Sequence, residues 1–193
     1  MRLGILGSTR GSNMLAIIRA IQEKKLSVSI EIVMSNKVDA LILDRAQSHG
    51  LNAQYIDPKG LSRNEYDKVL SDCLLKAQVD LIVLIGYMRI LSPCFVDLWT
   101  NKIINVHPSL LPAFSGLMDL QVHQAVLDSG ISETGCTVHY VTQEVDAGPI
   151  LLQKKCPVLT GDRAESLKDR VQTLEAEALI EAIQLIARKR CLA

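Results

Sequence analysis

Short apolar runs alternate with segments of helical periodicity through the first half of the chain. The apolar runs are rich in Ile, Val and Leu, which predicts buried strands, and the segments between them repeat apolar residues every three or four positions. Strands are predicted at residues 3–6, 28–34, 52–56, 80–85 and 102–106. Helices are predicted at residues 38–49 and 61–77, and a further helix follows the first strand, with Ser12 or Asn13 placed to cap it. Because strands and helices alternate, we expect right-handed βαβ units and a Rossmann-like parallel sheet covered on both faces.

The pattern changes after residue 112. A loop at residues 114–117 precedes a short helix at 120–127, and strands are expected at 135–141 and from 150 to at least 153. The short connection between these strands predicts antiparallel pairing. Asp162 and Glu165 have the spacing of a capping box before a last helix that ends near residue 188. The predicted fold class is therefore α/β, with a mostly parallel first half and a mixed sheet completed by antiparallel strands and a long C-terminal helix.

The length of 193 residues predicts one domain, in which we distinguish a mononucleotide-binding half, residues 1–100, and a second half, residues 101–193. Lys plus Arg equals Asp plus Glu at 21 each, so no overall field favours nucleic acid or a membrane surface. No apolar run approaches the length of a membrane span, and five cysteines without C-x-x-C spacing suit reduced thiols. We expect a cytoplasmic protein without a bound metal.

Two polar side chains close the strand predicted at residues 102–106. Asn105 offers an uncharged donor that can stabilise an oxyanion, and His107 can give or take a proton near neutral pH. Pro108 keeps His107 out of the helical region, so the ring leaves the strand in a narrowly defined direction. The alternative for this pair is a structural role, in which both side chains form hydrogen bonds at the end of the strand and take no part in catalysis.

Strands one and four also end in glycine. The loop from Gly7 through Gly11 to a helix start suits a phosphate, although it lacks the G-x-G-x-x-G spacing of dinucleotide sites and is equally consistent with a tight turn. Gly86 permits close approach of a ligand to the backbone, and Arg89 offers a fork for a carboxylate or is simply exposed. Since ligands in such sheets lie beyond the carboxyl ends of strands, we expect one crevice near all three strand ends.

Four motifs in this order give the chain a family resemblance. They are Gly11-Ser12-Asn13, residues 86–91 (GYMRIL), residues 105–112 (NVHPSLLP) and residues 146–150 (DAGPI). The chain resembles the 10-formyltetrahydrofolate-dependent formyltransferases over nearly its whole length, and within them the branch that formylates glycinamide ribonucleotide in purine biosynthesis. The resemblance implies 10-formyltetrahydrofolate as co-substrate.

The resemblance also implies roles for individual residues. Asn105 would stabilise the oxyanion, His107 would act as proton donor or electrostatic partner, and Asp146 would orient that histidine. The residues implied to bind the nucleotide substrate are Gly11, Ser12, Asn13, Gly86, Pro108, Gln172 and Glu175. Those implied to line the folate site are Arg63, Met88, Arg89, Ile90, Leu91, Val138, His139, Tyr140 and Val141. For His139, a structural hydrogen-bonding role is the open alternative, and His123 is left outside the catalytic set.

The resemblance favours direct acyl transfer between small molecules. The balanced charge argues against nucleic acid or a membrane as partner, and both a monomer and a homodimer are left open. Formyltetrahydrofolate deformylases are a rival with a similar Asn, His and Asp set, but they resemble this chain only after an extra N-terminal domain. Methionyl-tRNA formyltransferases add a C-terminal domain that grips RNA. A non-catalytic nucleotide-binding module or a nicotinamide oxidoreductase would share the parallel sheet, and the Asn-His-Asp set and the missing glycine fingerprint argue against them.

Overall fold

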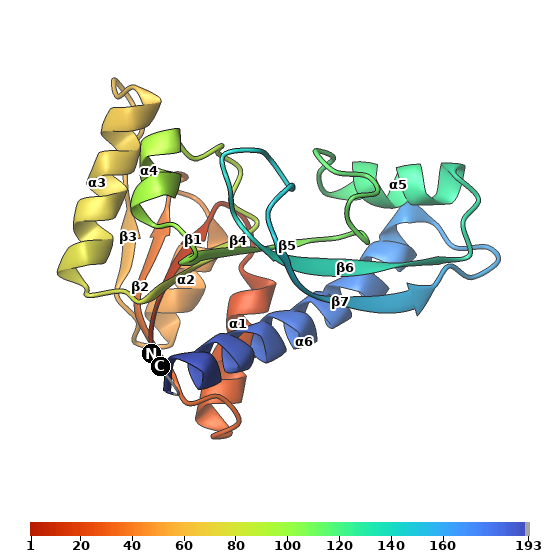
Figure 1. Ribbon diagram of the computed structural model, residues 1–193, viewed down its shortest axis with the longest axis horizontal. Coiled ribbons are helices and arrows are strands. Elements are labelled where there is room, and N and C mark those ends of the chain that lie inside the picture. The colour runs from red at the N-terminus through yellow and green to blue at the C-terminus, as the bar shows by residue number, and fades with distance from the viewer. Residues whose placement is uncertain (192–193) are drawn as a thin grey trace. The chain divides into compact units, whose positions relative to one another are not determined.

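The computed structural model describes residues 1–191 (Figure 1). The strands are β1 (Arg2–Gly7), β2 (Ser29–Ser35), β3 (Ala53–Tyr55), β4 (Leu81–Ile85), β5 (Ile103–His107), β6 (Glu133–Tyr140) and β7 (Ile150–Pro157). The helices are α1 (Ser12–Gln22), α2 (Leu41–Ser48), α3 (Arg63–Lys76), α4 (Pro93–Leu98), α5 (Leu120–Asp128) and α6 (Ala164–Cys191). None of these helices is long and apolar enough to cross a membrane, over the residues described.

The seven strands form a mixed sheet in the order β3-β2-β1-β4-β5-β6-β7. The pairs β1–β2, β1–β4 and β2–β3 are parallel, whereas β6 and β7 are antiparallel. The predicted fold class, including the mixed sheet and the long last helix, is confirmed. Chain contacts divide the molecule into two compact units, Met1–Ile104 and the residues from Asn105 onward.

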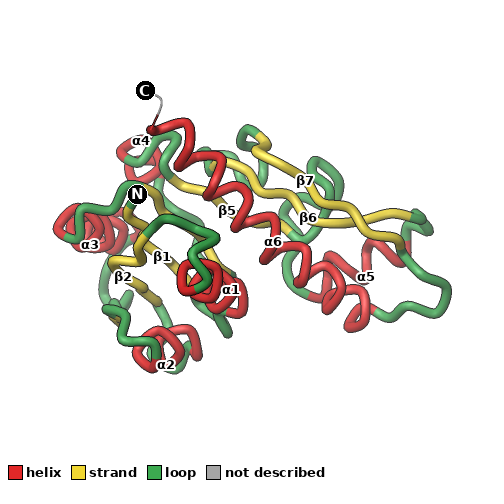
Figure 2. Tube along the Cα trace, turned by 90° about the horizontal axis from the view of Figure 1, so that it is seen from below, coloured by secondary structure: helices red, strands yellow, loops and turns green. Residues whose placement is uncertain are grey.

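In the first unit the helices cover both faces of the parallel strands. Side chains alternate across a strand, so Gly4 and Gly7 of β1 face opposite sides. A Cβ on Gly4 would meet Leu74 of α3, and a Cβ on Gly7 would meet Ile42 of α2. Helices α1 and α2 pack together, as do α3 and α4, and Figure 2 shows α3 across β1 and β2 from α1. The absence of side chains at the two glycines lets both layers approach the strand closely.

In the second unit α6 packs along β6 and β7 (Figure 1). Eight of its apolar side chains are 0–8% exposed at helical spacing and form the buried stripe: Ala164, Leu167, Val171, Ala178, Leu179, Ala182, Ile183 and Ile186. Helix α5 lies beside the N-terminal part of α6 (Figure 2), and Lys168 forms an ion pair with Asp119 just before α5. This packing gives the β6–β7 hairpin a rigid support.

Several predicted boundaries need correction. Helix α2 begins at Leu41 rather than 38, α6 continues to Cys191, and the short α4 was not predicted. The N-cap of α1 is Gly11, with no side-chain cap, so the expected capping by Ser12 or Asn13 is wrong.

The expected capping box at Asp162 and Glu165 is also wrong. The helix begins two residues after Asp162, whose carboxylate instead accepts two hydrogen bonds from Arg170, at 2.6 and 2.9 Å. This bidentate contact, together with the N–H of Leu159, holds the pKa of Asp162 well below its usual range. The Asp162 carboxylate is therefore paired with Arg170 and does not cap the helix.

Candidate active site

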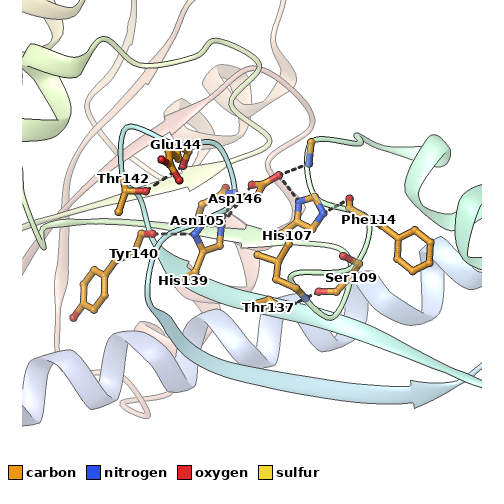
Figure 3. A network of polar contacts seen from close by, with 12 residues as sticks. Asn105, His107, Ser109, Phe114, Thr137, His139, Tyr140, Thr142, Glu144 and Asp146 are labelled. Atoms are coloured by element: carbon orange, nitrogen blue, oxygen red, sulfur yellow. Dashed lines mark hydrogen bonds and ion pairs between the residues drawn. The ribbon is translucent and has the colours of Figure 1, made fainter.

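A histidine and an aspartate meet in the second unit. His107 is the last residue of β5 and is 4% exposed, and its Nδ1 lies 3.3 Å from Oδ2 of Asp146 (Figure 3). Asp146 belongs to the loop between β6 and β7 and has a φ of 55°. Aspartate tolerates this left-handed conformation better than most residues, which allows the carboxylate to point back at the ring.

The loop after β5 completes the surroundings of this pair. The carbonyl oxygen of Phe114 lies 3.1 Å from Nε2 of His107 (Figure 3). The Gly116 N–H donates to Oδ2 of Asp146 at 2.9 Å. A carbonyl and a carboxylate can only accept hydrogen bonds, so the imidazolium form of His107 satisfies both of its neighbours at once. Phe114 has a φ of 61°, which aims its carbonyl at the ring. No sequence pattern reports such a backbone contact.

Asn105 lies beside a second buried histidine. Its Nδ2 is 3.3 Å from Nε2 of His139, whose Nδ1 is 2.9 Å from the carbonyl oxygen of Tyr140 (Figure 3). Burial lowers the pKa of His139, and only the Tyr140 carbonyl and the Asp146 charge oppose this effect. Asp146 Oδ1 lies 3.7 Å from Nε2 of His139, outside normal hydrogen-bond range. The structure therefore brings together four of the predicted site residues: Asn105, His107, His139 and Asp146.

The segment that follows His107 is fixed by the hairpin. The Thr137 hydroxyl donates to Ser109 O at 2.7 Å and accepts from Leu111 N at 3.0 Å and from Gln153 Nε2 at 2.9 Å. Thr137 is fully buried, and Gln153 also donates to Leu111 O. The sequence analysis missed both residues. Alternation along β6 was the available signal, because it places Thr137 on the same face as His139.

His123 of α5 is a third buried histidine in this unit. It is 2% exposed, and burial, followed by the positive charge of Lys168, lowers its pKa to about 4. Within the described residues its Nδ1 has no hydrogen-bond partner. The neutral ring explains why it needs none of the charge pairing seen at His107.

The predicted phosphate loop lies in the first unit. Gly11 has a φ of 71°, and a Cβ there would meet Ile42 at 2.5 Å, so the turn into α1 requires glycine. Ser12 and Asn13 open the helix, whose first N–H groups have no intrahelical acceptors. Their backbone donors and the positive helix end can bind an anion.

The segment from Gly86 to Leu91 also lies in the first unit. The Met88 N–H donates to the Ser8 hydroxyl at 3.0 Å, and that hydroxyl donates to Asn36 Oδ1 at 2.6 Å. Met88 and Ile90 are 42% and 58% exposed, whereas Leu91 is buried. The sequence analysis did not predict the role of Ser8, because no residue spacing distinguishes its hydroxyl from others in a glycine-containing loop.

Arg89 in this segment stacks on a buried aromatic ring. Its guanidinium carbon lies 4.4 Å from the centroid of Tyr66, which is fully buried in α3. Asp67, next in α3, accepts from the Ser92 N–H at 2.5 Å. Helix α3 therefore supports both Arg89 and the end of the segment, a role that the sequence analysis did not predict for Tyr66 or Asp67.

The other predicted residues are distributed over several elements. Arg63 is exposed at the start of α3, Gln172 and Glu175 are half-buried on α6, and Pro108 follows His107. Val138 is fully buried in β6, while Tyr140 and Val141 are half-buried at its end. Their binding roles stay predictions.

A family model described as formyl transferase matches residues 1–183. The chain belongs to this family. The predicted family is thereby confirmed, and the Asn105, His107 and Asp146 cluster is a feature of a formyl transferase chain.

Named relatives match most of the chain. Phosphoribosylglycinamide formyltransferase of Escherichia coli (strain K12) is 41% identical over 176 residues, which are 91% of this chain and 82% of that protein. The trifunctional purine biosynthetic protein adenosine-3 of Homo sapiens is 41% identical over 187 residues, but this chain spans only 18% of its length. The crystal structure of glycinamide ribonucleotide transformylase 1 from Symbiobacterium toebii matches 98% of this chain and 89% of that one with a TM-score of 0.94 and 40% identity.

Proposed function

We propose that this protein transfers the formyl group of 10-formyltetrahydrofolate to the amine of glycinamide ribonucleotide, giving formylglycinamide ribonucleotide and tetrahydrofolate. The observation that carries the proposal is the buried contact between His107 and Asp146, with Asn105 on the same strand as the histidine. A proton donor and an uncharged hydrogen-bond donor are the groups that acyl transfer to an amine requires. The names of the Escherichia coli and Symbiobacterium toebii relatives support this choice of substrate.

The proposed reaction is direct. The amine of the nucleotide attacks the formyl carbon, the carbonyl oxygen becomes an oxyanion, and the tetrahedral intermediate collapses with release of the folate nitrogen. The amine loses one proton, and the folate nitrogen gains one. Asn105 donates to the oxyanion through its amide, and His107 exchanges the protons, oriented by Asp146.

No side-chain nucleophile is required by this scheme. The thiol of Cys136, which lies next to Thr137 in β6, is fully buried, and burial raises its pKa to about 12. A thiol in this environment stays protonated and unreactive. The chemistry of the site therefore favours transfer between two bound substrates over a covalent enzyme intermediate.

The binding roles belong to the same proposal. The nucleotide phosphate would bind the N–H groups at Gly11, Ser12 and Asn13, while Gly86, Pro108, Gln172 and Glu175 would contact the rest of that substrate. The folate would contact Arg63, Met88, Arg89, Ile90 and Leu91, together with Val138, His139, Tyr140 and Val141. The protein would act in the cytoplasm as a monomer or homodimer, with small molecules as its only substrates and no metal.

The test is an absorbance assay of 10-formyltetrahydrofolate conversion with and without glycinamide ribonucleotide. We expect conversion that requires the nucleotide, with the formyl group recovered on its amine. Conversion to formate in the absence of the nucleotide would instead identify a deformylase. Binding of either substrate without any conversion would leave a binding module and contradict the proposal.

A further inference from the structure

The side-chain amide of Asn105 has two ends with opposite properties. Its nitrogen donates hydrogen bonds and its oxygen accepts them, and only the nitrogen can stabilise an oxyanion. Rotation by half a turn about the last side-chain bond would exchange the two ends at almost no steric cost. Some neighbour must therefore select the orientation, and the neighbour in contact is His139, with 3.3 Å between Asn105 Nδ2 and His139 Nε2 (Figure 3).

The hydrogen bonds of His139 determine which role its Nε2 can have. The carbonyl oxygen of Tyr140, 2.9 Å from Nδ1, can only accept, so Nδ1 carries a hydrogen. In the neutral ring Nε2 then has a lone pair and no hydrogen. The ring is 2% exposed, which favours the neutral form. The titratable groups that face it are Asp146, with Oδ1 at 3.7 Å from Nε2, and His107.

We propose that His139 is a positioning residue for the oxyanion donor. Its unprotonated Nε2 accepts one N–H of Asn105 and so selects the amide orientation in which the second N–H of the same nitrogen is available to the substrate. Among the described residues, this second N–H has no other hydrogen-bond partner. The inference rests on the proposed formyl transfer, because the developing oxyanion is the acceptor that this N–H would meet.

The backbone around His139 favours the tautomer with the hydrogen on Nδ1. The Tyr140 N–H donates to Pro149 O at 2.9 Å, which fixes the peptide next to the accepting carbonyl. A Cβ on Gly148 would lie 1.8 Å from that carbonyl oxygen, so the carbonyl occupies the space of a missing side chain. The register of β6 and β7 shifts between Val138 and His139, and such a shift re-aims a side chain. The loop that carries Asp146 therefore also orients His139.

Two substitutions of His139 separate its two nitrogens. Asparagine places a polar atom near the position of Nδ1, so His139→Asn can keep the contact with Tyr140 O but loses the acceptor for Asn105. Glutamine reaches the position of Nε2, so His139→Gln can restore that acceptor. We expect kcat to fall about 10- to 100-fold in His139→Asn, less than for complete loss of an oxyanion donor, with KM for the nucleotide substrate within about twofold of wild type. His139→Gln should recover most of the lost kcat.

A double-mutant cycle with Asn105 gives the decisive readout. In an Asn105→Ala background nothing remains to be oriented, so adding His139→Asn should change kcat by less than about threefold. If His139→Asn lowers kcat by the same factor in both backgrounds, or if His139→Gln is as slow as His139→Asn, His139 has only a structural role and the inference is wrong. Circular dichroism and thermal unfolding of each variant check that the proteins are folded. Failure of wild-type formyl transfer would refute the proposed function instead, so the two failures are distinguishable.

Discussion

The guanidinium carbon of Arg89 lies 4.4 Å from the centroid of the Tyr66 ring, with the ring fully buried behind it. A planar guanidinium stacks on an aromatic face, whereas an ammonium cannot stack in the same way. Burial of the ring in α3 holds it in place, and the Tyr66 hydroxyl donates to Ile56 O at 3.2 Å. Arg89 is therefore presented in one defined position on the segment predicted to bind the folate.

This arrangement predicts a change in folate affinity. Arg89→Lys keeps the charge but loses the stacked fork, so KM for 10-formyltetrahydrofolate should rise about tenfold with kcat unchanged, equivalent to about 1.4 kcal/mol of binding free energy. Steady-state kinetics with the nucleotide saturating would measure this. Tyr66→Phe is the control, since it keeps the ring and should leave KM within about twofold. An equal effect of both changes would mean that the stack is irrelevant to binding.

Removal of the Asn105 or the His107 side chain should lower kcat. We expect Asn105→Ala to lower kcat by about 10²–10³ and His107→Ala by about 10²–10⁴, because the first loses an oxyanion donor and the second a proton donor. Single-turnover rates with both substrates saturating would measure the chemical step. A variant that is folded and retains most of its kcat would contradict the role of that residue.

Asp146→Asn should lower kcat. The change keeps the shape of the side chain and an acceptor for the Gly116 N–H, but it removes the carboxylate 3.3 Å from His107 Nδ1. Because His107 then loses the group that orients its ring, we expect kcat to fall about 10- to 100-fold, with KM for both substrates within about twofold of wild type. Single-turnover rates with both substrates saturating would measure the fall, and an unchanged rate would contradict the orienting role of Asp146.

Gly148→Ala should disturb both the hairpin and the site. The new methyl group would meet Tyr140 O at 1.8 Å and displace the carbonyl that binds His139 Nδ1. We expect a loss of about 1–3 kcal/mol in the free energy of unfolding and a fall in kcat. Gly50→Ala is the matched control. Gly50 has a φ of 71° but open space around it, so that change should cost about 1–2 kcal/mol without any effect on kcat.

His123 should make the folded protein sensitive to acid. Its pKa is lowered from 6.5 to about 4, so between these values the unfolded chain binds a proton at His123 that the folded protein does not. The free energy of unfolding should therefore fall as the pH drops from about 6.5 to 4, by about 3 kcal/mol from this residue.

Urea unfolding at pH 7.5 and pH 5 tests this sign. His139 acts in the same direction because its pKa is also lowered, so His123→Leu should reduce the pH dependence without abolishing it. His49→Gln is the matched control, because it removes an exposed imidazole instead of a buried one. Unaltered pH dependence in His123→Leu would show that His123 is not the group responsible.

The parts of the fold that follow from local pattern were predictable, and the parts that depend on distant contacts were not. Apolar runs located β1, β2 and β4, because a buried parallel strand needs aliphatic residues at nearly every position. The β6–β7 hairpin followed from its short connection. Asp162 was misassigned because its partner, Arg170, competes with the local backbone for the same carboxylate. Helix α4 was missed because it is only six residues long.

The same distinction applies to the candidate site. Asn105 and His107 could be predicted because they end one strand and precede a proline. Asp146 was assigned only through the family resemblance, since nothing local relates it to a histidine 39 positions earlier in the chain. The Phe114 carbonyl carries no side-chain signal at all. A site assembled from backbone groups and from loops distant in sequence is visible only after the chain has folded.

The Thr137 hydroxyl has one hydrogen and two lone pairs, and all three are used, on Ser109, Leu111 and Gln153. A valine of the same shape would leave the buried Ser109 O and Leu111 N–H without this partner and would take an acceptor from Gln153, whereas serine offers the same set of bonds from the same carbon. The segment that follows His107 and the β6–β7 hairpin are thus joined through one hydroxyl whose hydrogen-bonding capacity is fully used. Sequence drift in one of these segments is confined to changes that the other can accept, so the two must evolve as a pair.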